Sequence, residues 1–250
     1  MPLAGAFPLS PSLDSIGPLA RSVEACAAAD AVMAGEEYRP LQAAALRDLR
    51  IGVPRGLLFT ETDPMVAQAF EAALSALSAA GARVGNTAFD DLLARMAEAT
   101  AAGPIAAVEA AEVHADWLDA EEAAFDPRVH TRISRGRTVT AAAYIRMMRT
   151  RATLIEAGDE RLRALDVLAL PATAIPAPTI ASVAEDDAAF ARTNLLMLRN
   201  TMVGNLFDLT GISLPLPGQG KPVGLMLLAR HGQDRWLLEI AAGVEAALRA

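Results

Sequence analysis

Side chains that could catalyse a reaction are few in this sequence, and none of them forms a complete catalytic motif. The three histidines, His114, His130 and His231, lie far apart, and no His-Glu-x-x-His zinc motif occurs. Cys26 lies among alanines, where no neighbouring residue type favours a thiolate. Lys221 is the only lysine, so any serine–lysine mechanism would have to use it. It lies in a Gly/Pro-rich turn, where we expect no burial that would lower the pKa of its amine.

Three further patterns point away from metal and nucleotide chemistry. Gly218-Gln219-Gly220-Lys221 is similar to a phosphate loop, but Pro222 follows where a hydroxyl residue would be needed. We interpret it as a turn. Glu112, Asp116 and Asp119 share one helix face that could hold a divalent ion, although a solvated face is the commoner reason for such a pattern. No Gly-x-Ser-x-Gly nucleophile turn occurs. We therefore expect no metal site.

Charge is segregated in the middle of the chain. Seven acids and no Lys or Arg occur from Glu109 to Asp126, and seven arginines and no acid from Arg128 to Arg151. The segregation favours two helical segments that neutralise each other, and a binding patch for an anionic substrate or RNA is the alternative. Arg132 is the best candidate for a binding role, because a guanidinium can hold a carboxylate through two parallel hydrogen bonds.

The elements that must position these residues are alternating helices and short buried strands. We expect strands at 50–54, near 83–84, at 166–170, 212–214 and 223–228, the last two joined by a turn at 217–220. Helices are expected from the cap Ser22 to Gly35, from Asp63-Pro64 to Gly81, through most of 89–164, over 187–208 and over 233–249. This order predicts an α/β fold, with a mixed sheet flanked by helices, in a single domain over 1–250.

Composition narrows the functional classes. The chain has 250 residues and a net charge of −8, which does not favour direct binding to nucleic acid. The longest uncharged run, 167–184, contains three prolines and predicts a strand and a loop rather than a membrane span. One cysteine and no visible targeting segment favour a cytoplasmic protein.

Several blocks along the chain closely resemble one enzyme family. The segment Phe7-Pro8-Leu9-Ser10-Pro11-Ser12-Leu13-Asp14-Ser15-Ile16-Gly17-Pro18 resembles the region that follows the nucleophile in the amidase signature family. Further similarity lies at 126–129, 135–136, 144–145, 168–178, 199–201, 205–206, 212–215 and 222–225. These blocks occur in family order, and the likeness extends to bacterial amidases and to the A subunit of glutamyl-tRNA amidotransferase.

The resemblance implies a reaction and a set of candidate residues. Family members hydrolyse a carboxamide with a Ser–cis-Ser–Lys triad and use no metal or organic cofactor. Their triad precedes the segment that matches 7–18, so the resemblance carries over no catalytic residue and implies an amidase-signature fold without its N-terminal half. It implies that Asp14, Arg132, Asn200 and Asn205 lie near the substrate. Two of these have structural alternatives, since Asp14 could organise a turn and Asn200 could cap a helix over 201–208.

Three hypotheses follow for what the chain does. In the first, the chain is the C-terminal part of an amidase, produced from an incomplete gene or from an internal start, and it is inactive alone. The second is a non-catalytic subunit or binding module that uses the retained wall of a pocket for a small amide. The third is an enzyme with a separate site of its own. For the first two we expect exposed strand edges, and hence a homodimer or a complementing polypeptide. The substrate is not determined.

Overall fold

The computed structural model describes residues 2–218 and 220–249 of this chain. Contacts divide the chain into two compact units, Met1–Gly17 with Leu92–Ala157, and Pro18–Asp91 with Gly158–Ala250. We call them the small unit and the large unit. The division into units is one of contacts and does not show that either unit folds independently. The single domain predicted over 1–250 therefore stays a prediction. Gln219, at the centre of the expected turn, lies outside the described residues.

The large unit holds a five-stranded mixed sheet with the strand order β2-β1-β3-β5-β4. β1 runs parallel to β2 and β3, while β5 runs antiparallel to β3 and β4. The strands are β1 (Arg50–Val53), β2 (Arg83–Asn86), β3 (Val167–Pro171), β4 (Thr210–Pro215) and β5 (Gly224–Ala229). Both the mixed sheet and the α/β class are confirmed.

Helices and short 3₁₀ turns connect these strands. In the large unit they are α1 (Val23–Ala34), η1 (Leu57–Phe59), α2 (Pro64–Ala79), η4 (Ile180–Ser182), α7 (Asp187–Arg199), α8 (Met202–Leu206) and α9 (Asp234–Arg249). The helices α3 (Asp90–Ala99) and α6 (Ala141–Leu162) contain the boundaries between the units. The small unit also holds α4 (Ile105–Val113), η2 (Glu122–Ala124), α5 (Pro127–Arg135) and η3 (Gly136–Thr138).

Local sequence sets several helix ends as predicted. The Ser22 hydroxyl accepts a hydrogen bond from the Ala25 amide at 3.2 Å, and Gly35 ends α1 in the left-handed region with φ of 73°. The Asp63 carboxylate accepts from the Met65 amide at 2.8 Å and starts α2 ahead of Pro64. Each cap satisfies a backbone group at a helix end, where the helix itself offers no partner.

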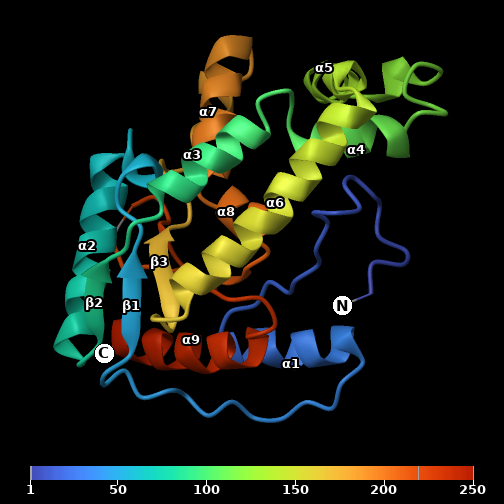
Figure 1. The fold of residues 1–250 in the computed structure, drawn as a ribbon. Coiled ribbons are helices and arrows are strands. Elements are labelled where there is room, and N and C mark those ends of the chain that lie inside the picture. The colour runs from blue at the N-terminus through green and yellow to red at the C-terminus, as the bar shows by residue number, and fades with distance from the viewer. Residues whose placement is uncertain (1, 219, 250) are drawn as a thin grey trace. The chain divides into compact units, whose positions relative to one another are not determined.

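One face of the sheet carries the main core of the large unit. Ile51 and Val53 of β1 share this core with Phe70, Leu74 and Leu77 of α2. Side chains of α9 close the same core against β4 and β5: Leu237, Ile240, Ala241 and Val244. α1 and α9 lie side by side in Figure 1, although they belong to opposite ends of the chain. Successive side chains of a strand point to opposite faces, so every second residue of β1, β3 and β5 enters this core.

The small unit has a core of its own beneath α4 and α5. Ala110 and Leu118 are fully buried, and Ile133 of α5 packs against them. Leu118 is buried within the acidic block 109–126, so this block has an apolar side. None of the helices described over 2–218 and 220–249 is long and apolar enough to cross a membrane.

Candidate functional site

The carboxyl ends of β1 and β3 are the first place to look for a site in the large unit. From β1 the chain goes first to β2 on one side and later to β3 on the other, so the strand order reverses between β1 and β3. In open α/β sheets, ligands bind outside the strands at such a reversal. The loops that leave β1 and β3 are therefore candidate site segments, and Arg199 and Asn200 tie them together.

Asn200 is fully buried and holds the end of β3. Its Nδ2 donates to the Pro171 carbonyl at 2.8 Å, and its Oδ1 accepts from the Arg199 Nε at 3.1 Å. The expectation that Asn200 caps a helix over 201–208 is wrong, because the side chain points to β3 and α8 begins at Met202 after Thr201. The continuous helix expected over 187–208 is interrupted at the same point. A direct contact between Asn200 and substrate stays a prediction.

Arg199 holds the loop after β1. Its Nη2 donates to the Leu58 carbonyl at 2.7 Å, and its Nη1 donates to the Thr60 carbonyl at 2.6 Å. Burial lowers the pKa of this guanidinium from its ordinary value, while the charge of Glu61 acts in the opposite direction. Sequence reasoning quoted Arg199 only as part of a similar block. The only signal in the sequence was the adjacent pair Arg199-Asn200, in which a side chain with several hydrogen-bond donors precedes an amide side chain.

Asn205 lies exposed on α8, in the same unit as Asn200. Asn205 is exposed, whereas Asn200 is fully buried. A surface position leaves a substrate-binding role open to Asn205, and that role stays a prediction. The prolines after β3 lead into a loop as expected, in which the Lys221 Nζ donates to the Ala177 carbonyl at 3.0 Å.

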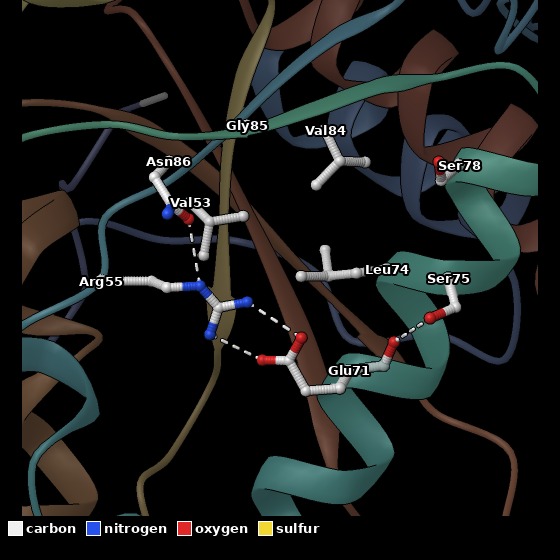
Figure 2. Close-up of a pocket in the computed structure, with 9 residues that line it drawn as sticks. All are labelled: Val53, Arg55, Glu71, Leu74, Ser75, Ser78, Val84, Gly85 and Asn86. Carbon is white, nitrogen blue, oxygen red and sulfur yellow. Dashed lines mark hydrogen bonds and ion pairs between the residues drawn. The ribbon is translucent and has the colours of Figure 1, made fainter.

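A second candidate in the large unit is the cavity between α2 and the ends of β1 and β2 (Figure 2). Its volume is about 430 Å³. The Arg55 guanidinium donates to both carboxylate oxygens of Glu71 at 2.7 and 2.9 Å, and to the Asn86 Oδ1 at 3.1 Å. The bond to Glu71 raises the pKa of Arg55 further above its ordinary value. Glu71 thus already occupies the carboxylate-binding side of this guanidinium.

In the small unit, a buried carboxylate fixes the segment that carries Asp14. Glu109 of α4 accepts at Oε2 from the Ser10 hydroxyl at 2.5 Å and the Ser12 amide at 3.0 Å. Its Oε1 accepts from the Tyr144 hydroxyl of α6 at 2.5 Å. Asp14 accepts from the Leu9 and Ser10 amides at 2.9 and 3.0 Å, which is the predicted organisation of a turn.

These hydrogen bonds determine the ionisation of the Glu109 cluster, which we define as Glu109, Ser10, Ser12 and Tyr144. Burial alone would raise the pKa of the Glu109 carboxyl, but the hydrogen bonds from Ser10, Tyr144 and Ser12 hold it below its usual range. Burial and the bond to Glu109 raise the pKa of Tyr144 to about 12. Glu109 is therefore a charged anchor and Tyr144 a proton donor at neutral pH.

Sequence reasoning missed Glu109 because it counted the residue within the acidic block. One signal could have separated it from the other acids. Glu109 follows Ile105 by four positions, so both lie on the same face of an expected helix. Ile105 is 2% exposed and Glu109 is 8% exposed. An acid on an apolar helix face needs hydrogen-bond partners, and the serines and tyrosine supply them.

Arg132 lies exposed on α5, whose last turn also carries Arg135. The charge segregation has one direct consequence nearby, since the Arg137 Nη1 donates to the Asp119 carboxylate at 2.7 Å. This pair joins the basic and acidic blocks as predicted for two segments that neutralise each other. The exposure of Arg132 is compatible with the carboxylate-binding role, which stays a prediction.

Histidine and metal chemistry find little support in the described residues. His114 is 2% exposed and stacks on the Phe7 ring with the ring centroids 5.3 Å apart, which is the packing of a core histidine. Within 2–218 and 220–249, no group of three His, Cys, Asp or Glu side chains is arranged to hold a metal ion. The expectation that the protein uses no metal or cofactor stays a prediction.

Comparison with known proteins identifies the family. The family described as Amidase matches residues 1–238. This chain belongs to the amidase family. A crystal structure of an amidase superimposes with a TM-score of 0.78 and 27% identity, and the match covers 98% of this chain and 55% of the amidase. The α/β sheet described above is therefore the amidase-signature fold, of which this chain contains about half.

Two curated relatives of this amidase-family chain illustrate its range. It is 32% identical to 2-amino-5-chloromuconic acid deaminase from Comamonas testosteroni, over 98% of the chain and 54% of that protein. It is 25% identical to the A subunit of glutamyl-tRNA(Gln) amidotransferase from Koribacter versatilis, over 98% of the chain and 58% of that protein. The chain thus spans little more than half the length of the curated relatives it matches.

Proposed function

We propose that this chain forms the substrate-side part of an amidase that hydrolyses a small carboxamide. In this reaction water replaces nitrogen on the carbonyl carbon, so the amide and water give a carboxylate and ammonia or an amine. The observation that carries the proposal is the match of the amidase family to residues 1–238. The named relatives include a deaminase and part of an amidotransferase, and both names refer to chemistry at nitrogen.

The catalytic groups are proposed to come from amidase sequence outside this chain. In the family resemblance they are a nucleophilic serine, a bridging serine and a neutral lysine. Lys221 is exposed and its Nζ donates to the Ala177 carbonyl, so it is not a buried lysine placed beside a serine. Ser10 is 1% exposed and its hydroxyl donates to Glu109, so it offers no accessible nucleophile.

In this proposal the chain positions the loops after β1 and β3 and the segment that carries Asp14. Arg199 and Asn200 fix the loops after β1 and β3, and Glu109 fixes the segment that ends in Asp14. Asp14, Arg132, Asn200 and Asn205 are proposed to bind or position substrate. We further propose that the protein works in the cytoplasm, which the single cysteine supports.

A non-catalytic subunit is the second candidate. The observation that favours it is the extent of the match, since the chain spans 54% and 58% of the two relatives named above. In that case the retained segments would bind an amide or a carboxylate without hydrolysing it. Binding without turnover, measured by calorimetry with a carboxylate such as succinate, would support this alternative.

Ammonia release tests the proposal. The purified chain is assayed with a panel of aliphatic and aryl carboxamides, alone and after co-expression with the unmatched portion of the Comamonas relative. We expect release only from the combination, and the variant Lys221→Ala should leave it unchanged. Release by the chain alone that Lys221→Ala abolishes would show that this chain carries its own catalytic lysine. No release from any combination would leave the family membership intact but contradict the amidase function.

A further inference from the structure

The cavity beside Arg55 has an apolar side and polar groups at both ends (Figure 2). Val53 and Leu74 are almost completely buried and, with Val84, form the apolar side. Val53 pairs with Asn86 in the sheet, so both side chains lie on the face that α2 covers. The volume of about 430 Å³ is sufficient for a small molecule.

Three neighbouring side chains fix Arg55 at one end of this cavity. The guanidinium donates to Glu71 at 2.7 and 2.9 Å and to the Asn86 Oδ1 at 3.1 Å. Its Cζ lies 5.6 Å from the centroid of the Phe59 ring. These hydrogen bonds use three of the five N–H groups of an arginine. Among residues 2–218 and 220–249 nothing accepts from the other two, which leaves them for a ligand.

The charges at this end favour an uncharged ligand. Because Glu71 neutralises Arg55, an anion would meet the carboxylate and a cation would meet the guanidinium. An uncharged carbonyl oxygen can accept from Arg55 without either repulsion. An amide also has N–H groups, and the remaining lone pairs of the Glu71 carboxylate can accept a hydrogen bond from them.

The opposite end of the cavity is uncharged. Figure 2 shows Ser78 across the cavity from Arg55, with Leu74 and Val84 between them. The Ser78 hydroxyl makes no hydrogen bond within the described part of the chain. Ser75 donates to the Glu71 backbone carbonyl at 2.9 Å and carries no charge either. The cavity therefore fits a molecule with a polar head group and an aliphatic body.

We propose that this cavity binds a small uncharged carbonyl compound with an aliphatic group, and that a primary amide is its best head group. The amide oxygen accepts from Arg55, and the amide nitrogen donates to Glu71. The aliphatic group lies against the three apolar side chains. This site does not depend on the proposed function, because none of the four residues proposed there to bind or position substrate lines the cavity.

NMR titration of the isotope-labelled chain with isovaleramide tests the proposal. We expect saturable shifts that are largest at Gly85 and Asn86, which line the cavity. Isovalerate and isoamylammonium have a similar aliphatic group but carry a charge. Each should bind at least about tenfold more weakly, because a hydrogen bond is replaced by a repulsion.

Two results of this titration would overturn the proposal. The first is the absence of saturable shifts at the cavity, or equal binding of the three compounds. The second is a set of shifts confined to the segments around Arg132, Asn200 or Asn205, which would place the amide at the residues proposed to bind substrate.

Glu71→Gln tests the charge argument. The variant keeps the size of the side chain but leaves Arg55 without a counter-charge. Isovalerate should then bind at least about tenfold more tightly than it binds the wild type, since a guanidinium can hold a carboxylate through two hydrogen bonds. Glu71 is exposed, so we expect the variant to fold, and thermal unfolding checks this. An unchanged preference for the amide would contradict the proposal.

Filling the cavity is the second test. Ser78→Phe should abolish the binding of isovaleramide, because the ring would occupy the space between α2 and β2. Ala76→Phe is the matched control, since Ala76 is exposed on the same helix and does not line the cavity. Unchanged binding by a folded Ser78→Phe variant, or equal losses in both variants, would refute the site.

Discussion

Glu109→Gln is the substitution for which the structure makes the sharpest prediction. The Glu109 carboxylate accepts three hydrogen bonds, at 2.5 Å from Ser10, 3.0 Å from Ser12 and 2.5 Å from Tyr144. Hydrogen bonds to a charged group contribute about 1.5–3 kcal/mol each, and neutral ones about 0.5–1.5 kcal/mol. Glutamine keeps the size of the side chain and removes the charge. We expect the free energy of unfolding to fall by about 2 kcal/mol, since glutamine also costs less to bury.

Tyr144 reports whether the cause is the lost charge. Its pKa lies at about 12, and burial of the ring is the larger cause, followed by the bond to Glu109. An ordinary tyrosine has a pKa of about 10, and one unit corresponds to about 1.4 kcal/mol. Because the hydrogen bond to Glu109 and its charge both raise this pKa, Glu109→Gln should lower the pKa of Tyr144 from about 12 towards the ordinary value.

The assay follows tyrosinate absorbance as pH rises. The chain has two tyrosines, so Tyr38→Phe leaves Tyr144 as the only phenol to titrate. Urea unfolding gives the stability change, with Tyr144→Phe as the matched control that removes one bond and should cost about 1 kcal/mol. A wild-type Tyr144 that titrates near 10, or a Tyr144 titration that Glu109→Gln does not change, would refute the reasoning.

Three other predictions concern both units. Asn200→Ala should lower the free energy of unfolding by about 2–3 kcal/mol in urea, because it leaves a buried carbonyl unpaired, whereas the exposed Asn205→Ala should cost less than about 1 kcal/mol. Gly136→Ala should prevent stable folding, because the added Cβ would lie 2.0 Å from the Ala107 carbonyl oxygen. Thermal unfolding measures this effect. Gly17→Ala is the control and should be tolerated, because its Cβ would meet no atom within 4 Å. Burial acts to raise the pKa of the Asp166 carboxyl, but hydrogen bonds from the Arg50 amide at 2.7 Å and Nη2 at 2.8 Å hold it below its ordinary value of 3.8. Folding should therefore weaken as pH falls below 3.8, and Asp166→Asn should flatten this part of the stability–pH profile.

The sign of the pH dependence at Glu109 is the same as at Asp166. A carboxyl whose pKa is lower in the folded state stabilises the fold above its unfolded pKa, and this contribution is lost as pH falls through the folded pKa. Tyr144 acts at the other extreme. Its raised pKa stabilises the fold below about pH 10, and the contribution is lost as pH rises towards 12.

Much of the fold could be predicted from local sequence. Ser22, Gly35 and Asp63-Pro64 set helix ends because caps act on backbone groups only a few residues away. The apolar run at β3 and the paired apolar segments at β4 and β5 gave the strands for the same reason. The break between α7 and α8 could not be predicted this way, because it depends on a bond from Asn200 to a strand 29 residues earlier.

The sequence by itself determined the α/β class, the family and the shortage of catalytic side chains, since each depends on residue types and their order. Only the tertiary structure decided which polar residues are anchors. In the sequence, Glu109 was only one member of the acidic block and Arg199 only one member of a block similar to the family. The fold surrounds Glu109 with hydroxyl and amide donors and Arg199 with carbonyls. Burial makes an unpaired charge costly, so partners distant in sequence must meet it.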